Sequence, residues 1–266
     1  MRHWMRLLSV WLVFSAFLFP ATLSLAQGDD LTVTSYNISG KQVIVAHPSQ
    51  MNQFSGNPDM LRTALTRAEA IYESLFGPTP MKIFAEFVKT QHSDGAGVLG
   101  EAGKLTVDVP APNTNRRNSE TVCSITIYNV PGNQSDASLA ITVAHEFVHC
   151  YQGFLMREDP PLLGKKERAW WIEGSAEWLA QKVYPELDVS PEVNAWQSKF
   201  INNLGESLTN ENYSYDAMYF WHALERHTNI TRAMEFLKQL LRNPDNAVEV
   251  WSGCPTSIAC SPPTAG

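Results

Sequence analysis

The sequence predicts an α+β fold, in which a first half of strands and helices precedes an almost purely helical second half. Residues 31–46 alternate apolar and polar side chains around Ser39-Gly40, a pattern typical of a β-hairpin. Beyond about residue 137, capping residues, apolar stretches and good helix formers predict helices. Three further apolar runs read as strands, at 81–89, 104–109 and 121–130.

The helices follow from their start and stop signals. Asn57-Pro58 opens a helix that carries an apolar stripe and ends before Gly77-Pro78. Asp136 can cap an apolar helix over about 137–154. The remaining helices are expected to open at Trp170-Trp171 and to span 191–203, 213–227 and 231–242.

The segment His145-Glu146-Phe147-Val148-His149 lies inside the helix expected over 137–154. Residues four apart share one face of a helix, so the two imidazoles can bind one metal ion, and Glu146 can reach a water on that ion. Two histidines and a glutamate are costly to bury in an apolar helix without partners, and a metal supplies them. This spacing is the zinc metallopeptidase signature, with His145 and His149 as ligands and Glu146 as general base.

A hydrolytic zinc site needs a third protein ligand and one open position for water. Glu173 and Glu177 share one face of the next helix, four residues apart, among the large aromatics Trp170, Trp171 and Trp178. The alternative interpretation is that the two carboxylates form a solvated stripe. We expect one of these two carboxylates to supply the third ligand, because this helix lies where that ligand is missing.

The segment from Trp171 to Ala176 resembles the Trp-x-x-Glu-Gly-x-Ala pattern of the gluzincin metallopeptidases, in their peptidase-MA-like branch. One residue fewer separates Trp171 from the glutamate, and Trp170 restores the spacing. The resemblance implies a zincin-like architecture: a small twisted N-terminal sheet, the His-Glu-x-x-His helix and a mainly helical C-terminal lobe. It also implies that Glu173 is the third ligand and Glu177 an outer partner of a zinc histidine.

The chemistry implied by this resemblance is hydrolysis with Zn²⁺, although two imidazoles and a carboxylate could also accept cobalt or manganese. Glu146 would take a proton from the attacking water and return it to the leaving amine. Tyr215 resembles the tyrosine that opens the corresponding helix in this branch and would stabilise the oxyanion. Tyr219 is the alternative, and the less favoured ones are His222 and His227.

The resemblance implies that the chain is a zinc-dependent peptidase that acts on peptides or proteins. The strand around residues 125–128 would then be the sheet edge that holds an extended substrate. Endopeptidase action is weakly favoured, because the Gly-x-Met-x-Asn segment of gluzincin aminopeptidases is absent. The alternatives are a non-peptidase zinc hydrolase and an inactive metal-binding module on the same scaffold.

An export signal is expected at 1–26. The order of features is that of a cleaved signal peptide: basic residues, then an apolar run, then the small residues Ser24 and Ala26. This pattern predicts a secreted or periplasmic protein with no stable membrane span. The metallopeptidase domain is expected over 27–240, with an α/β lobe to about 154 and a helical lobe from about 155 to 242. A formal charge of -7 and the lack of a basic stripe argue against nucleic acid as a partner.

An exported chain meets an oxidising environment, so its four cysteines should form disulfides. Three pairings are possible. We favour Cys123 with Cys150, which ties a strand to the motif helix, and Cys254 with Cys260, which closes a small loop in an irregular tail over 243–266.

Overall fold

The structure is a computed structural model. It describes residues 31–48, 58–79, 81–88, 100–110, 117–128, 136–156, 168–186, 191–208 and 213–244. The expected signal peptide at 1–26 and the expected Cys254–Cys260 pair lie outside these residues.

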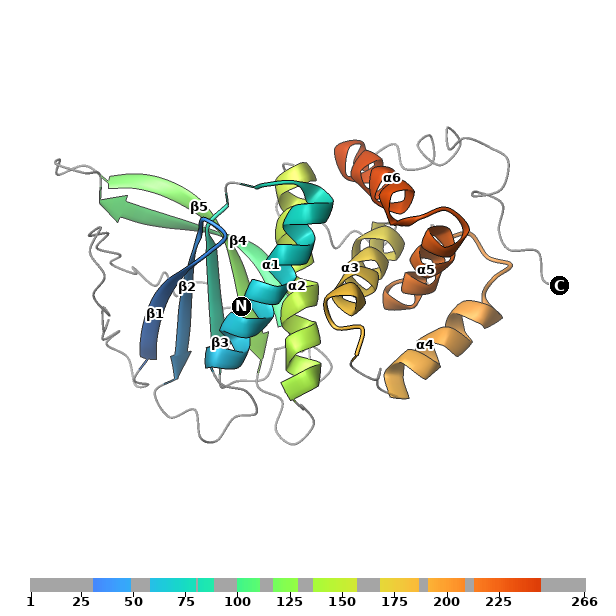
Figure 1. Ribbon diagram of the computed structural model, residues 1–266, viewed down its shortest axis with the longest axis horizontal. Coiled ribbons are helices and arrows are strands. Elements are labelled where there is room, and N and C mark those ends of the chain that lie inside the picture. Colours follow the sequence, from blue (N-terminus) through green and yellow to red (C-terminus); the bar gives the residue numbers. More distant parts are fainter. Residues whose placement is uncertain are drawn as a thin grey trace, which may run out of the picture.

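A five-stranded mixed sheet forms one side of the molecule (Figure 1). Its strands run in the order β1-β2-β3-β5-β4, and the pairs β1–β2 and β4–β5 are antiparallel, while β3 is parallel to both β2 and β5. The strands are β1 (Leu31–Ile38), β2 (Lys41–Pro48), β3 (Ile83–Val88), β4 (Gly100–Pro110) and β5 (Arg117–Tyr128). A parallel pair needs a crossover connection, and α1 (Pro58–Phe76) supplies it between β2 and β3.

The predicted turn and stop signals are confirmed. Ser39 and Gly40 both have positive φ, 49° and 82°, as a two-residue hairpin turn of the primed type requires, and Asn37 Oδ1 accepts a hydrogen bond from the Gly40 amide. At the end of α1, Gly77 has a φ of 94° and its N–H donates to the Glu73 carbonyl. This left-handed residue ends the helix, as glycine commonly does.

Two expectations about the sheet are wrong. The strand that contains residues 125–128, β5, is not an edge, because β3 and β4 pair with its two sides. Among the described strands, β4 forms the edge on that side. It also begins at Gly100, earlier than predicted, because the glycine-containing stretch up to Gly103 pairs in register with β5.

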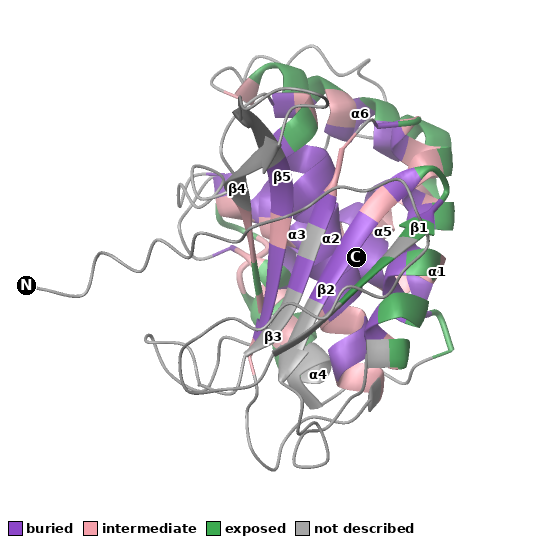
Figure 2. Ribbon diagram, turned by 90° about the vertical axis from the view of Figure 1, so that its left-hand side faces the viewer, coloured by how far each residue is buried: buried purple, intermediate pink, exposed green. Residues whose placement is uncertain are grey.

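Helices α1 and α2 (Asp136–Met156) cover one face of the sheet, and α3 (Ala169–Val183) packs on the far side of α2 (Figure 1). Most residues of α2 and α3 are buried, so the layer between them is interior (Figure 2). The other helical elements are α4 (Pro191–Asn202), the short 3-10 helix η4 (Tyr215–Ala217), α5 (Met218–His227) and α6 (Ile230–Arg242). Elements η4 and α5 pack on α3, and α4 packs on η4, whereas α6 packs against α1, α2 and α5.

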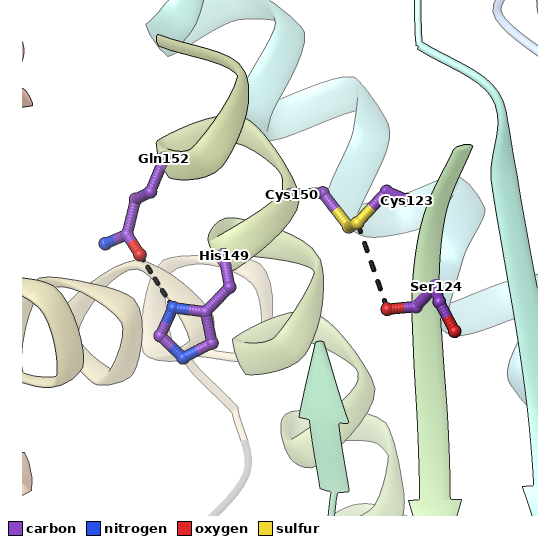
Figure 3. Close-up of a disulfide and its surroundings, with 5 residues drawn as sticks. All are labelled: Cys123, Ser124, His149, Cys150 and Gln152. Atoms are coloured by element: carbon purple, nitrogen blue, oxygen red, sulfur yellow. Dashed lines mark hydrogen bonds between the residues drawn. A yellow bond between two sulfur atoms is a disulfide. The ribbon is translucent and has the colours of Figure 1, made fainter. Parts of the chain in front are cut away.

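The predicted disulfide between Cys123 and Cys150 is confirmed, and it ties β5 to the middle of α2 (Figure 3). Cys150 and His149 leave different sides of the helix, so the disulfide faces the sheet while the imidazole faces away from it (Figure 3). Within the described part of the chain, no helix has the length and apolar character needed to cross a bilayer.

Candidate metal centre

Helix α2 places His145 and His149 on its face toward α3. Both imidazoles are buried, and their ring centroids lie 4.9 Å apart. Glu146 is also buried, one residue along. The helix tolerates these polar groups because α3 places two carboxylates opposite them, those of Glu173 and Glu177.

Three acceptor atoms converge between the two helices, and we call them the three-acceptor cluster: His145 Nε2, His149 Nε2 and Glu173 Oε2. The two Nε2 atoms are 3.2 Å apart, and Glu173 Oε2 lies 3.2 Å from that of His145 and 3.4 Å from that of His149. Zinc bonds of about 2.0–2.1 Å in a tetrahedral arrangement separate neighbouring donor atoms by about 3.3 Å. The cluster therefore fits a zinc ion with a fourth position left open.

The Nδ1 atoms of the two imidazoles face acceptors of their own. His145 Nδ1 lies 3.2 Å from Glu177 Oε2, and His149 Nδ1 lies 2.6 Å from Gln152 Oε1. In its neutral form, each ring therefore carries its proton on Nδ1 and directs the lone pair of Nε2 into the cluster. Two lone pairs and a carboxylate oxygen repel one another unless a cation lies between them.

The electrostatics of the cluster also favour positive charge. Burial alone would lower the pKa of His145, but its hydrogen bonds with Glu173 and Glu177 outweigh burial and raise that pKa well above the usual value. Burial would raise the pKa of Glu173, but the imidazoles of His149 and His145 hold it well below its usual range. In the absence of metal, a proton takes the place of the cation.

Zinc should therefore stabilise the protein more at high pH than at low pH. The pKa of His145 is higher in the folded metal-free protein than in the unfolded chain. Protonation of His145 therefore stabilises the fold fully at pH values below the pKa of the unfolded chain, and this stabilisation is lost as the pH rises through the pKa of the folded protein. Zinc replaces that proton, so the stabilisation that zinc provides grows over the pH range in which His145 would otherwise lose its proton. Melting curves with and without zinc, from about pH 6 to about pH 8, should show a widening difference in Tm, whereas a constant or narrowing difference contradicts the assignment.

Glu146 lies beside the cluster and against the sheet edge. Burial raises the pKa of Glu146, and the charges of His145 and His149 oppose that effect. A Cβ on Gly100 would lie 2.9 Å from Glu146 Cγ and from Thr142 Cγ2, so only glycine allows β4 to begin this close to α2. The carboxylate is thus held between the first residue of the edge strand and the metal centre.

Tyr215 is the tyrosine that the structure brings to the cluster. Its ring centroid lies 5.4 Å from that of His145, and its other neighbour is Trp196 of α4, stacked at 5.6 Å. The charge of Glu173, followed by burial and the charge of Glu146, raises the pKa of Tyr215, so its hydroxyl remains a donor.

The alternatives to Tyr215 make other contacts. The ring of Tyr219 packs against Phe200, and His222 bonds to the side chain of Gln181. His227, at the end of α5, is exposed.

Gly174 allows η4, which carries Tyr215, to approach α3 closely. A Cβ at Gly174 would lie 2.8 Å from Ala217 Cβ and 2.9 Å from the Ala217 carbonyl carbon. Gly174→Ala should therefore push η4 away from the metal centre and lower the free energy of unfolding by about 1–3 kcal/mol, as overpacking does.

The matched control is Gly205→Ala, because a Cβ at Gly205 meets nothing within 4 Å. Thermal melting of both variants provides the comparison. If Gly174→Ala behaved like the Gly205 variant, the close contact with Ala217 would not position η4.

Three residues of the site were not predicted from the sequence. Gln152 lies three residues after His149. A polar amide within an apolar helix was the signal in the sequence, because an amide that is buried there, as Gln152 is, needs hydrogen-bond partners. Gly100 and Trp196 gave no local signal, because their roles depend on contacts with distant segments.

Comparisons with known proteins describe the fold. A family model described as "Family of unknown function (DUF6055)" matches residues 117–249, from β5 to just beyond α6. No curated protein matches the sequence significantly.

Solved structures resemble the chain at low identity. An aminopeptidase N family protein from Idiomarina loihiensis superposes with a TM-score of 0.50 at 11% identity, over 85% of this chain and 44% of its own. A two-domain M1 zinc metallopeptidase mutant bound to L-tryptophan gives 0.51 at 12%, over 86% and 49%. An M1 zinc metallopeptidase mutant from Deinococcus radiodurans gives 0.50 at 12%, also over 86% and 49%. The chain thus shares an α+β fold with these proteins and spans less than half of their length.

Proposed function

The chain belongs to the family of unknown function DUF6055, and we propose that it is an exported zinc-dependent peptidase in which Glu146 is the general base. The observation that carries the proposal is the three-acceptor cluster, with pairwise distances of 3.2, 3.2 and 3.4 Å beside a buried carboxylate. A purely structural zinc site is usually closed by four protein ligands. This cluster supplies three and has a base next to it.

His145, His149 and Glu173 would hold the ion. Two imidazoles and one carboxylate are a ligand set that suits zinc. When bound, zinc lowers the pKa of a coordinated water toward neutrality and polarises the scissile carbonyl. Glu177 would keep the His145 ring in the tautomer that presents Nε2 to the ion.

Glu146 would take a proton from the attacking water on its carboxylate and deliver it to the leaving amine. Its raised pKa suits this exchange, because a base works best when its pKa lies near the working pH. Tyr215 would donate its hydroxyl proton in a hydrogen bond to the oxyanion, and the raised pKa of that hydroxyl keeps it protonated.

The substrate would bind as an extended peptide along β4. This strand is the described sheet edge next to the metal centre, and its first residue lies against Glu146. An edge strand has a free row of backbone donors and acceptors with which a peptide can pair. We therefore propose that β4, and not β5, binds the substrate.

Export is supported by the signal-like sequence at 1–26 and by the Cys123–Cys150 disulfide. The disulfide fits an oxidising compartment.

A cleavage screen tests the proposal. The zinc-loaded full chain would be incubated with a peptide library, with and without a chelator, and the products identified by mass spectrometry. We expect cleavage that the chelator abolishes and added zinc restores. No cleavage by protein shown to contain zinc, or cleavage unaffected by the chelator, would overturn the proposal.

A further inference from the structure

Gln152 is a fully buried amide that contacts both helices of the metal centre. It lies one helical turn after His149 on α2, and its Oε1 is 2.6 Å from His149 Nδ1 (Figure 3). On its other side, Nε2 donates to the carbonyl of Ile172 and to Ser175 Oγ, both at 3.0 Å. All the hydrogen-bonding groups of this side chain therefore point at residues of the metal centre or directly beside it.

These contacts determine which way the amide faces. The Ile172 carbonyl can only accept, so the NH₂ group of Gln152 must face it. Ser175 donates its own hydroxyl proton to the same carbonyl at 3.3 Å, which leaves the lone pairs of Ser175 Oγ free to accept from Gln152. The remaining Oε1 is then an acceptor aimed at His149.

The amide therefore selects one tautomer of His149. An acceptor at 2.6 Å requires the ring proton to be on Nδ1, and the Nε2 lone pair then points at Glu173 and His145. Without this acceptor, nothing described near His149 Nδ1 would favour that tautomer over the reverse one, in which Nε2 is protonated and cannot bind a metal.

The same amide also couples the two helices. Ile172 and Ser175 lie on either side of Glu173 in α3, so the two donated bonds hold the helical turn that carries the third acceptor. A glutamate at position 152 could accept from His149, but as a carboxylate it could not donate to the Ile172 carbonyl. A neutral amide does both.

We propose that Gln152 is the positioning residue of the metal centre. It holds His149 in the Nδ1–H tautomer, and it holds the turn of α3 that carries Glu173 against His149. The proposal rests on the proposed zinc site. Its consequence is a tighter zinc Kd, because outer partners of this kind typically contribute 10–100-fold to metal affinity.

Two variants separate the two halves of this role. Gln152→Met fills a similar volume but removes both the acceptor and the donors, and should weaken zinc binding by about 10–100-fold. Gln152→Glu keeps the acceptor and loses the donors, so its zinc Kd should stay much closer to the original while its Tm falls. The control is Gln239→Met, an exposed site on α6, which should change neither quantity.

The measurement is competition for Zn²⁺ between each full-length protein and a chelator of known affinity, with melting curves of the metal-free forms. A lower Tm with unchanged zinc Kd in Gln152→Met would mean a merely structural role and would overturn the proposal. Equal losses of affinity in the Met and Glu variants would do the same, because the acceptor would then be irrelevant. If the unaltered chain bound no zinc, the failure would belong to the proposed function instead.

A direct readout needs no variant. ¹⁵N NMR of the imidazoles in the zinc-loaded protein should show His149 protonated at Nδ1 and bound through Nε2. Finding the reverse arrangement would end the proposal even if both substitutions prevented folding.

Discussion

Glu146→Gln should retain zinc and lose about two to four orders of magnitude in peptide turnover, the usual contribution of a general base. The substitution preserves shape but removes the group that can accept a proton from water. The three-acceptor cluster does not include Glu146, so the zinc content should be unchanged. The turnover of a peptide found in the screen and elemental analysis of the same sample measure the two quantities.

Glu235→Gln is the matched control, because Glu235 is exposed on α6 and pairs only locally with Arg232. It should leave both turnover and zinc content intact. Full activity in the Glu146 variant would show that another group moves the proton.

Glu173→Ala should have the second largest effect, which is a loss of the metal. Glu173 Oε2 is the only carboxylate oxygen that the cluster contains, and the imidazoles of His145 and His149 alone would leave the cation with two ligands. We expect zinc affinity to fall by more than the roughly 10–100-fold typical of an outer partner. Zinc content after dialysis, measured by elemental analysis, provides the test.

Glu177→Gln is the informative comparison for that experiment. Glu177 contacts His145 at Nδ1, on the side away from the cluster, so its substitution should weaken zinc binding less than that of Glu173. The opposite ranking would identify Glu177 as the ligand.

Local signals in the sequence were enough to predict that His145 and His149 lie side by side on one helix. The spacing of His145 and His149 determines their common face, because a helix repeats every 3.6 residues whatever its tertiary surroundings. The turn at Ser39-Gly40 and the stop at Gly77 were predictable for the same reason, since each depends on the backbone freedom of one or two residues.

Features that depend on long-range pairing were not predictable in the same way. The position of β5 between β3 and β4 depends on its pairing with β3, from which β4 separates it in the sequence, and so the edge position was assigned to the wrong strand. The stretch from Gly100 to Gly103 has poor strand propensity and forms β4 because it pairs with β5. Trp196 stacks on Tyr215 through a contact between α4 and η4 that no local pattern encodes.

The Cys123–Cys150 disulfide has a practical consequence for work with this protein. Its half-cystines are 27 residues apart, and closing a loop of that size disfavours the unfolded chain by roughly 3–4 kcal/mol. Cys150 directly follows His149, so dithiothreitol would release the helix from β5 next to a proposed ligand and, as a dithiol, could also withdraw the zinc. Inactivation by a thiol reagent would therefore not identify which bond was lost, and a chelator without sulfur is the appropriate probe.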